Sequence, residues 1–416
     1  MNKGEFAKRL LIELQTPRAD WIPVGEIASV NDRNTFRSLA EYWENPDRVL
    51  LGRIFEERDT SWSPSAQTSL PRWFSHLLPQ GLLRREVSMH ADIKEVREFP
   101  LLSALGASDL PGAVRATPLA TGRSGTEIEH YEFDESDASE RALKFSLAGL
   151  QLKFSLRSTD RGPTVPVSGE AGDSILKLPD GRPEFDSVPD AEFGAMSLAR
   201  AVGLNIAGVQ LMDARSIEGL EKWAAARSGQ SLLVDRFDRR SDTGHRVHTE
   251  ELAQVLNIAS NQHTHKYTKA NFESIVSLIM GLSVQADAIE AIRRIHFNII
   301  IGNGDAHLKN WGLIYEDGIN ARLSPGYDIL PTVLYMPNDD LGLNIGGTKS
   351  FNDIRYKHFS QLAAIADVDS GDLMSLLHED LDKVKDNWSI MVDNLPANLG
   401  KKLSQRLIDL PLAADR

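Results

Sequence analysis

The chain has 416 residues, of which 41% are hydrophobic and 25% charged, a composition typical of a soluble globular protein with two or three domains. Acidic residues outnumber basic ones by 59 to 46, and the net charge of −13 argues against a free-standing nucleic-acid binder. The absence of cysteine excludes disulfides and thiolate chemistry and fits the reducing cytoplasm, and no run approaches the roughly twenty apolar residues that span a membrane.

Residues 1–120 are predicted to form a first unit with a helix and several short strands. Apolar residues between Phe6 and Leu14 recur at helical spacing, which predicts an amphipathic helix packed on this unit. Charges interrupt the same stretch, so it does not have the pattern of a signal peptide. Residues 49–55 favour a strand, and a helical pattern begins at Leu82.

A polar, partly acidic stretch at residues 121–140 predicts a linker or a mobile loop. Short apolar runs and one amphipathic helix follow, so residues 141–240 are predicted to form a strand-rich small lobe. Residues 241–416 are mostly helical in pattern and are predicted to form a large lobe. The elements predicted in the small lobe are strands at 143–156, 174–178, 209–212 and 231–237 and a helix at 191–202.

The most informative motif of the chain lies in the predicted large lobe. An acid and an amide, Asp305 and Asn310, stand five residues apart, and a second acid, Asp328, follows. The residues between them predict a hairpin with strands at 311–315 and 319–327, whose two ends would bring Asn310 and Asp328 together. This is the layout of a phosphoryl-transfer site, in which one carboxylate orients the attacking hydroxyl while an amide and a second carboxylate hold Mg²⁺.

A simpler interpretation of the motif is an ordinary turn, because Asn, Gly and Asp are common turn residues and a single Asp-x4-Asn arises by chance. The apolar helical run at residues 292–301 ends at Gly302, which would give the loop a rigid base. Two basic side chains stand inside the loop. Lys309 is placed to meet phosphate charge, and His307 is either a structural hydrogen-bonding group or a reacting one.

Three segments of the predicted small lobe could complete such a site. Residues 146–153 contain one glycine and form either a phosphate-cradling loop or a plain hairpin turn. Lys177 is a single charge in an apolar strand that either reaches solvent or pairs with phosphates, and Glu192 on the next helix is a candidate ion-pair partner. Residues 232–239 end a strand with alternating charges and either link the two lobes or form a solvated strand end.

Together these segments resemble the HipA family, the serine/threonine kinase toxins of bacterial toxin–antitoxin modules. The resemblance covers most of the chain, and residues 73–78 are also similar to the N-terminal subdomain of the family. It implies a bilobal, protein-kinase-like α/β (α+β) fold with an N-terminal HipA-type subdomain, a strand-rich small lobe and a helix-rich C-terminal lobe. The motifs that carry the resemblance are residues 146–153, 175–179, 234–239, 304–310 and 327–329.

The resemblance also implies roles for individual residues. Asp305 would be the catalytic base, and Asn310 and Asp328 would hold Mg²⁺. Ser146 matches the serine that these kinases phosphorylate on themselves, and its phosphate, with a charge of about −1.5 to −2, would repel the phosphates of ATP from the loop. Asp235 stands where a glutamate is usual in the family. The residues implied to bind ATP are Ala148, Gly149, Leu150, Gln151, Leu152, Lys153, Lys177, Asp235, Arg236, Phe237, His307, Lys309, Asn310, Tyr327 and Asp328.

The cofactors implied by the resemblance are ATP and Mg²⁺, and the implied partner is a small DNA-binding antitoxin through which the kinase would reach operator DNA. The protein targets of the family include aminoacyl-tRNA synthetases, whose phosphorylation stops translation. Two rival interpretations remain. A small-molecule phosphotransferase would act on free hydroxyl compounds, whereas a kinase-shaped co-repressor would bind ATP without turnover. The expected location is the cytoplasm, without membrane association.

Overall fold

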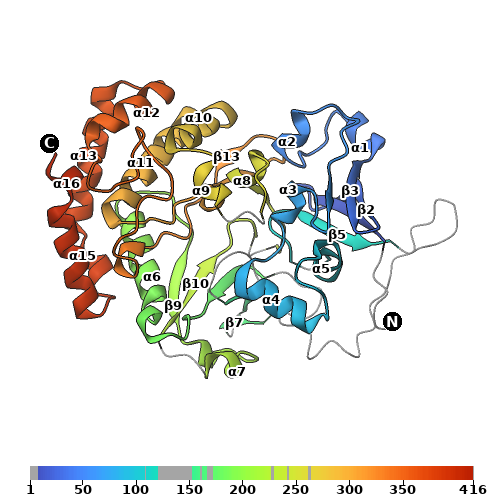
Figure 1. The fold of residues 1–416 in the computed structure, drawn as a ribbon, viewed down its shortest axis with the longest axis horizontal. Helices are drawn as coiled ribbons and strands as arrows, with labels where there is room; N and C mark the ends of the chain where they lie inside the picture. Colours follow the sequence, from blue (N-terminus) through green and yellow to red (C-terminus); the bar gives the residue numbers. More distant parts are fainter. Residues whose placement is uncertain are drawn as a thin grey trace.

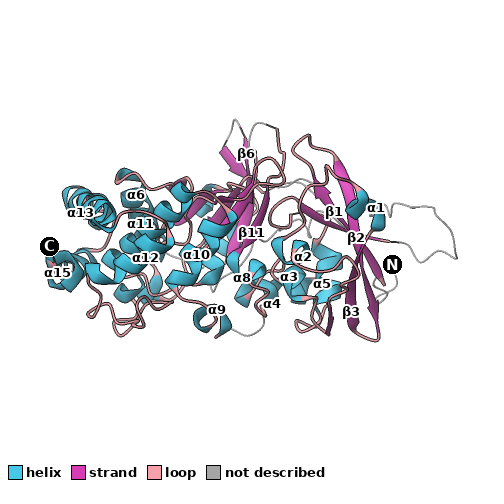
Figure 2. Ribbon diagram, turned by 90° about the horizontal axis from the view of Figure 1, so that it is seen from above, coloured by secondary structure: helices cyan, strands magenta, loops and turns pink. Residues whose placement is uncertain are grey.

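The computed structural model describes residues 8–107, 109–119, 152–159, 162–165, 172–225, 229–240, 243–260 and 264–415. Three antiparallel sheets are arranged along the molecule, with the N-terminal sheet towards one end and the C-terminal helices at the other (Figure 1, Figure 2). This is a mixed α/β architecture, as the sequence predicts. The linker predicted at 121–140 lies outside the described residues.

The N-terminal sheet contains a strand, β1, where the sequence pattern predicts a helix. Leu10, Ile12 and Leu14 alternate along β1 and are at most 1% exposed, so the apolar period is two residues and not 3.6. Both β2 and β5 pair with β1, which is therefore a central strand of the order β4-β3-β2-β1-β5. The strands are β1 Arg9–Gln15, β2 Trp21–Val30, β3 Arg33–Ser38, β4 Ser65–Gln67 and β5 Val114–Pro118.

An aromatic cluster joins this sheet to its short helices. Phe36 of β3 packs against Phe55 and Phe74, with ring centroids 5.4 and 4.7 Å apart, and Trp73 lies beside both of these rings. Residues 49–55 do not form the predicted strand, because the chain turns into α2 and buries Phe55 from a single helical turn. The helices are α1 Ala40–Glu44, α2 Arg53–Glu56, α3 Arg72–Ser75, α4 Gly81–His90 and α5 Glu98–Leu105.

The second sheet has the order β7-β6-β8-β10-β9, and α6 packs against it. Lys153 of β6 pairs with Lys177 of β8, so two lysines stand side by side on neighbouring strands. The predicted strand 143–156 is described from residue 152 onwards, and there β6 continues past the predicted end. The elements are β6 Lys153–Thr159, β7 Gly162–Thr164, β8 Ser174–Lys177, α6 Val188–Ala201, β9 Val209–Met212, α7 Glu221–Ala224 and β10 Ser231–Asp235.

The third sheet, β11-β12-β13, contains the predicted hairpin. Its second strand is shorter than predicted, because the Asp317 side chain closes a turn onto two following N–H groups and Pro325 has no N–H to donate. No helix in the described part of the chain is both long and apolar enough to cross a bilayer. The elements are β11 His248–Glu251, α8 Leu252–Val255, α9 His265–Thr268, α10 Phe272–Leu282, α11 Gln285–Ile301, β12 Gly312–Tyr315, β13 Arg322–Leu323, α12 Phe359–Ile365, α13 Ser370–Asp386, α14 Ser389–Val392, α15 Ala397–Asp409 and α16 Pro411–Ala414.

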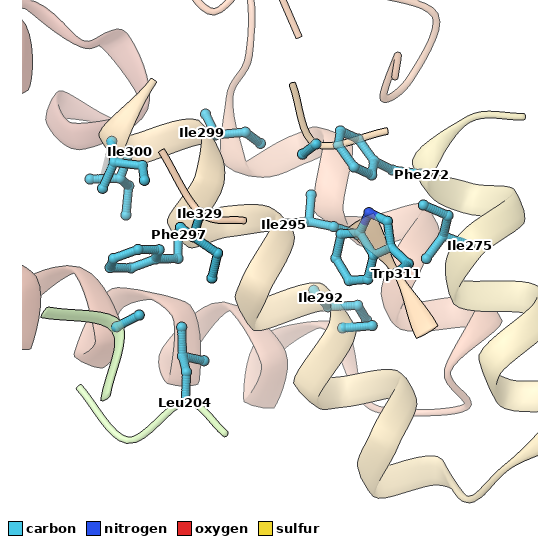
Figure 3. Close-up of a cluster of buried hydrophobic side chains, with 14 of the residues drawn as sticks. Leu204, Phe272, Ile275, Ile292, Ile295, Phe297, Ile299, Ile300, Trp311 and Ile329 are labelled. Carbon is cyan, nitrogen blue, oxygen red and sulfur yellow. The ribbon is translucent and has the colours of Figure 1, made fainter. Parts of the chain in front are cut away.

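The largest apolar core of the molecule surrounds α11. Figure 3 shows Trp311 and Ile329 beside isoleucine and phenylalanine side chains of this helix, and both are only 4% exposed. Burying such a side chain contributes about 1.5–3 kcal/mol. Because these two residues directly follow Asn310 and Asp328, the core fixes the chain on either side of the hairpin where the two predicted Mg²⁺ ligands stand.

Candidate active site

The loop that carries Asp305 starts where α11 ends. Gly302 has a left-handed backbone with φ of 77°, and the N–H of Asn303 donates to the carbonyl of Asn298 at 2.9 Å. A Cβ atom at Gly302 would lie 2.5 Å from Val333, so both the backbone angle and the space require glycine. The chain therefore leaves the helix in one defined direction.

Hydrogen bonds within the loop fix the backbone of Asp305 and leave its carboxylate accessible. Asn303 Oδ1 accepts from the Asp305 N–H at 3.0 Å, and Asn310 Nδ2 donates to the Asp305 carbonyl at 2.8 Å. Because this hydrogen bond holds the Nδ2 of Asn310, the Oδ1 of the same amide faces away from the Asp305 carbonyl. The Asp305 side chain is 48% exposed, so an incoming hydroxyl can reach it.

One small cavity joins this loop to the end of the hairpin. Its lining includes Asn303, Asn310, Tyr327 and Asp328. The Tyr327 hydroxyl also donates to the Lys309 carbonyl at 3.0 Å, which ties the two segments together. The structure therefore brings Asn310 and Asp328 to the lining of one cavity, the proximity that the hairpin predicts.

The donor set at this cavity fits Mg²⁺. Asn310 and Asp328 offer amide and carboxylate oxygens, the hard ligands that Mg²⁺ prefers, and Mg²⁺ usually completes its coordination with water and phosphate oxygens. Within the described residues, no group of three or more acidic or histidine side chains is arranged to hold a metal. The residues here therefore allow a Mg²⁺ site with two protein ligands, completed by phosphate oxygens.

Asp328 of the cavity lining belongs to a group of four charged side chains that we call the site cluster: Lys153, Lys177, Glu192 and Asp328. The Lys177 ammonium contacts the carboxylates of Glu192 and Asp328, and Lys153 Nζ lies 3.7 Å from Asp328 Oδ1. The side chains of Lys177 and Glu192 are 6% and 4% exposed. A strand lysine paired with a helix glutamate is the arrangement that protein kinases use to position the nucleotide phosphates.

The charges of the site cluster set the protonation of its acids. Burial alone would raise the pKa of Asp328, but the Lys153 and Lys177 ammonium groups outweigh it and hold that pKa well below its usual value. Burial raises the pKa of Glu192 above its usual value, although Lys177 opposes the rise. Asp328 also has φ of 52°, an uncommon value for a residue other than glycine and one often found at functional sites.

Two residues of α9 that the sequence-based prediction missed lie at the loop. The Tyr267 hydroxyl donates to Asp305 Oδ1, and Lys266 Nζ lies 2.6 Å from His307 Nε2. Burial and the Lys266 ammonium lower the pKa of His307 to about 3, so the ring is neutral and acts as a hydrogen-bonding group. Tyr267 precedes Asp305 by 38 residues, and no motif spacing in the sequence signals the contact.

Lys309 is buried and lies next to an acid of β11. Its ammonium is 3.6 Å from Glu251 Oε2, and the same oxygen is 3.3 Å from His76 Nδ1 of the N-terminal unit. Burial would raise the pKa of Glu251, but Lys309 and His76 hold it below its usual value. Lys309 therefore links the loop to the N-terminal unit in addition to the phosphate contact expected of it.

Arg236 belongs to a second buried group of charges, which we call the linking cluster: Asp109, Arg236, Asp238 and Arg239. Arg236 contacts Asp109 at 2.7 Å and Asp238 at 2.8 Å, and Arg239 contacts the same two acids at 3.1 and 2.9 Å. All four side chains are at most 10% exposed. The Arg236 guanidinium is thus fully used by its ion pairs with Asp109 and Asp238, so an adenine base could contact only the backbone of this residue.

The neighbours of Arg236 are arranged differently. Phe237 packs against Tyr327, with ring centroids 5.6 Å apart, and so lies on the side of the cavity. Asp235 is exposed, and its N–H donates to the Gly208 carbonyl at 2.8 Å. This segment therefore touches both the linking cluster and the site.

Part of the predicted phosphate loop is described. Leu152 is buried, and its carbonyl accepts from the Leu178 N–H at 3.0 Å, while Lys153 joins the site cluster. The remaining predicted residues of this segment, which lie outside the described residues, are Ser146, Ala148, Gly149, Leu150 and Gln151.

A strand-rich lobe with a Lys–Glu pair, a helix-rich lobe and the Asp305 loop define a protein-kinase-like architecture. Two family models match the chain. One, described as the HipA N-terminal domain, matches residues 18–117, and the other, described as the HipA-like C-terminal domain, matches residues 145–388. The chain therefore belongs to the HipA family.

Relatives and a solved structure agree with this assignment. The Sinorhizobium fredii (strain NBRC 101917 / NGR234) protein named "Putative kinase Y4dM" is 35% identical over 384 residues, which are 90% of this chain and 91% of that protein. A second protein of this strain, "Putative kinase Y4mE", is 29% identical over 72% of each chain. A chain from the Shewanella oneidensis MR-1 complex of HipA, HipB and operator DNA has the same fold, with a TM-score of 0.71 and 18% identity over 96% of both chains.

Proposed function

We propose that this protein is a serine/threonine protein kinase that transfers the γ-phosphoryl group of ATP to a hydroxyl of a protein target. The observation that carries the proposal is the joining of Lys177 to both Glu192 and Asp328, because Asp328 lines one cavity with Asn310 of the Asp305 loop. Glu192 and Asp328 hold the buried Lys177 ammonium where the nucleotide phosphates would lie. Phosphoryl transfer depends mainly on such positioning and charge stabilisation.

In the proposed reaction, Asp305 orients the acceptor hydroxyl. A bond forms between the acceptor oxygen and the γ-phosphorus, the bond from that phosphorus to the β–γ bridging oxygen breaks, ADP leaves, and Asp305 receives the hydroxyl proton. Mg²⁺ bound by Asn310 and Asp328 would neutralise charge on the phosphate oxygens. Partial burial raises the pKa of Asp305, which strengthens it as a base, while the Tyr267 hydroxyl and Lys266 oppose the rise.

We further propose that residues 146–153 wrap the ATP phosphates, that Lys153 and Lys177 contact them, and that residues 235–237 lie at the adenine. Residues 1–120, 141–240 and 241–416 would act as the N-terminal subdomain, the small lobe and the large lobe. Phosphate on Ser146 would bring negative charge into the phosphate loop and stop the enzyme, which then limits its own activity.

The partners belong to the same proposal. The Shewanella oneidensis complex contains HipA, HipB and operator DNA, which supports a small DNA-binding antitoxin as a partner of this chain. The net charge of −13 suits contact with DNA mainly through that antitoxin. The target would be a cytoplasmic protein, with an aminoacyl-tRNA synthetase as the candidate to test first.

The test uses the purified full chain, Mg²⁺ and γ-labelled ATP, with Asp305→Asn as the inactive variant. Glu379→Gln, an exposed acid of α13, is the matched control. We expect label in the native protein and in the control, mapped to Ser146 by mass spectrometry, and none in Asp305→Asn. A folded native protein that binds ATP but neither hydrolyses it nor becomes labelled would overturn the proposed activity.

A further inference from the structure

The hydroxyl of Tyr267 occupies one of the two carboxylate oxygens of Asp305, the residue proposed as the general base. It donates to Asp305 Oδ1, and the Asp305 N–H and carbonyl are already bonded within the loop, so the carboxylate is the part of this residue that faces outward. A base that takes a proton must accept a hydrogen bond from the acceptor hydroxyl. The contact of Tyr267 with Asp305 has this same O–H···O⁻ form.

Neighbouring side chains hold Tyr267 in place. Its ring packs edge-on against His307, with centroids 5.0 Å apart, and Lys266 Nζ lies 4.9 Å from the ring centre. Lys349 Nζ donates to the Tyr267 carbonyl at 3.2 Å and to the Gly342 carbonyl at 2.9 Å, which attaches α9 to the segment after the hairpin. The hydroxyl is thus positioned by its ring and its backbone, independently of the bond to Asp305.

The Tyr267 hydroxyl can leave Asp305 without opening the core. The Tyr267 side chain is only half-buried and the Asp305 side chain is 48% exposed, so solvent and a protein segment can both approach the contact. A hydrogen bond to a charged acceptor contributes about twice as much as a neutral one. The contact is therefore strong enough to compete with an incoming hydroxyl and exposed enough to be displaced by it.

We propose that the Tyr267 hydroxyl stands at the acceptor-hydroxyl position of the site, so that a protein hydroxyl or a water molecule must displace it from Asp305 before phosphoryl transfer. This rests on the proposed kinase function. It assigns α9 as a wall of the acceptor site and makes Tyr267 a competitor of every acceptor. The alternative role is orientation of Asp305, in which case removing the hydroxyl would slow the reaction.

ATP hydrolysis distinguishes the two roles, because water is then the acceptor and no protein target is needed. Tyr267→Phe removes only the hydroxyl. We expect hydrolysis at saturating Mg-ATP to rise about tenfold, the order expected when one hydrogen bond to a charged group is released, with KM for ATP unchanged. Tyr335→Phe is the matched control, since this half-buried hydroxyl bonds Ser187 at 3.1 Å, and its rate should equal that of the native protein.

Lys349→Ala provides a second variant that keeps the hydroxyl and removes the two hydrogen bonds that hold α9. We expect a smaller rise in hydrolysis than for Tyr267→Phe. Phosphate on Tyr267 in the native protein and not in Asp305→Asn would support the same position. An unchanged or lower rate in a folded Tyr267→Phe protein would overturn this inference alone, whereas absence of turnover in the native protein and all variants would overturn the proposed function as well.

Discussion

Two buried groups of charged side chains in this molecule contain equal numbers of cations and acids but differ in structure. The site cluster and the linking cluster each contain two cations and two acids. In the linking cluster both cations are arginines, and each contacts both acids at 2.7–3.1 Å. In the site cluster both cations are lysines, and their shared partner Asp328 is 29% exposed at the cavity.

The difference in cation explains what each cluster can do. A guanidinium forms a planar fork that fixes several hydrogen bonds at once, whereas an ammonium is a compact point charge that can exchange partners. Arginines therefore suit the permanent connection between Asp109 of the N-terminal unit and the segment after β10. Lysines suit a site in which Lys177 must share its charge between protein acids and nucleotide phosphates. If this comparison is right, substitutions in the two clusters affect different properties.

The largest effect is expected from Asp328→Asn in the site cluster. Removing the charge that would help to hold Mg²⁺ should lower the rate of ATP turnover by about 10³-fold or more. The free energy of unfolding should change less than for any acid of the linking cluster, because water reaches this position. Steady-state ATP hydrolysis and urea unfolding of the same preparation measure both effects. Turnover within about tenfold of the native rate would contradict the role given to Asp328.

The opposite pattern is expected from Asp109→Asn in the linking cluster. This change leaves two buried guanidinium groups with one carboxylate, and breaking a buried ion pair in this way costs about 3–5 kcal/mol of stability. Urea unfolding should show the loss, while ATP turnover at low temperature stays within about tenfold of the native rate. A loss of turnover without a loss of stability would mean that the linking cluster belongs to the active site.

A pH dependence of stability should come from the acids with a depressed pKa in both clusters, Asp328 in the site cluster and Asp238 in the linking cluster. Burial would raise the pKa of Asp238, but Arg236 and Arg239 outweigh it and hold that pKa far below its usual value. A depressed pKa stabilises the folded state above the unfolded-state pKa, about 3.9 for aspartate, and this contribution is lost as the pH falls through the folded-state value. The melting temperature should therefore decrease as the pH is lowered from about 5.

The variant Asp238→Asn tests this assignment. Its melting temperature should be lower at neutral pH and should decrease less between about pH 5 and pH 3 than that of the native protein. Glu379→Gln, which changes an exposed acid, should keep the native slope. If Asp238→Asn and the native protein have parallel pH profiles, Asp238 makes no contribution to the acid sensitivity and Asp328 is the next acid to test.

Local patterns in the sequence predicted those elements in which the spacing of apolar residues fits only a helix or only a strand. The long apolar run of α11 ends at a glycine, and the turn at Asp317 separates two strands, so the helix and the hairpin follow from the sequence. The N-terminal prediction was wrong because apolar residues near Leu10 and Leu14 fit both a helical and a strand period. Pairing of β1 with β2 and β5 decides the outcome, and the β5 partner, in which Val114 lies opposite Leu14, is far along the chain.

The same limit applies to the site. Lys177 and Glu192 are 15 residues apart, and a strand followed by a helix is enough to suggest their pairing. The contact of Asp109 with Arg236 spans 127 residues and that of Tyr267 with Asp305 spans 38, and neither segment carries a motif for its partner. A buried aspartate and a half-buried tyrosine look ordinary in a sequence. Only the packing of three sheets and α9 reveals their partners.

The smallest effect is expected from an ion pair of the same chemistry at the surface. Arg240 follows the linking cluster directly and contacts Glu316, but their side chains are 46% and 54% exposed. Solvent screening limits such a pair to about 0–1 kcal/mol. Arg240→Ala should therefore shift the urea midpoint far less than Asp109→Asn does. Added salt should make the shift caused by Arg240→Ala smaller still. A shift as large as that of Asp109→Asn would show that burial is not what distinguishes the linking cluster from other ion pairs.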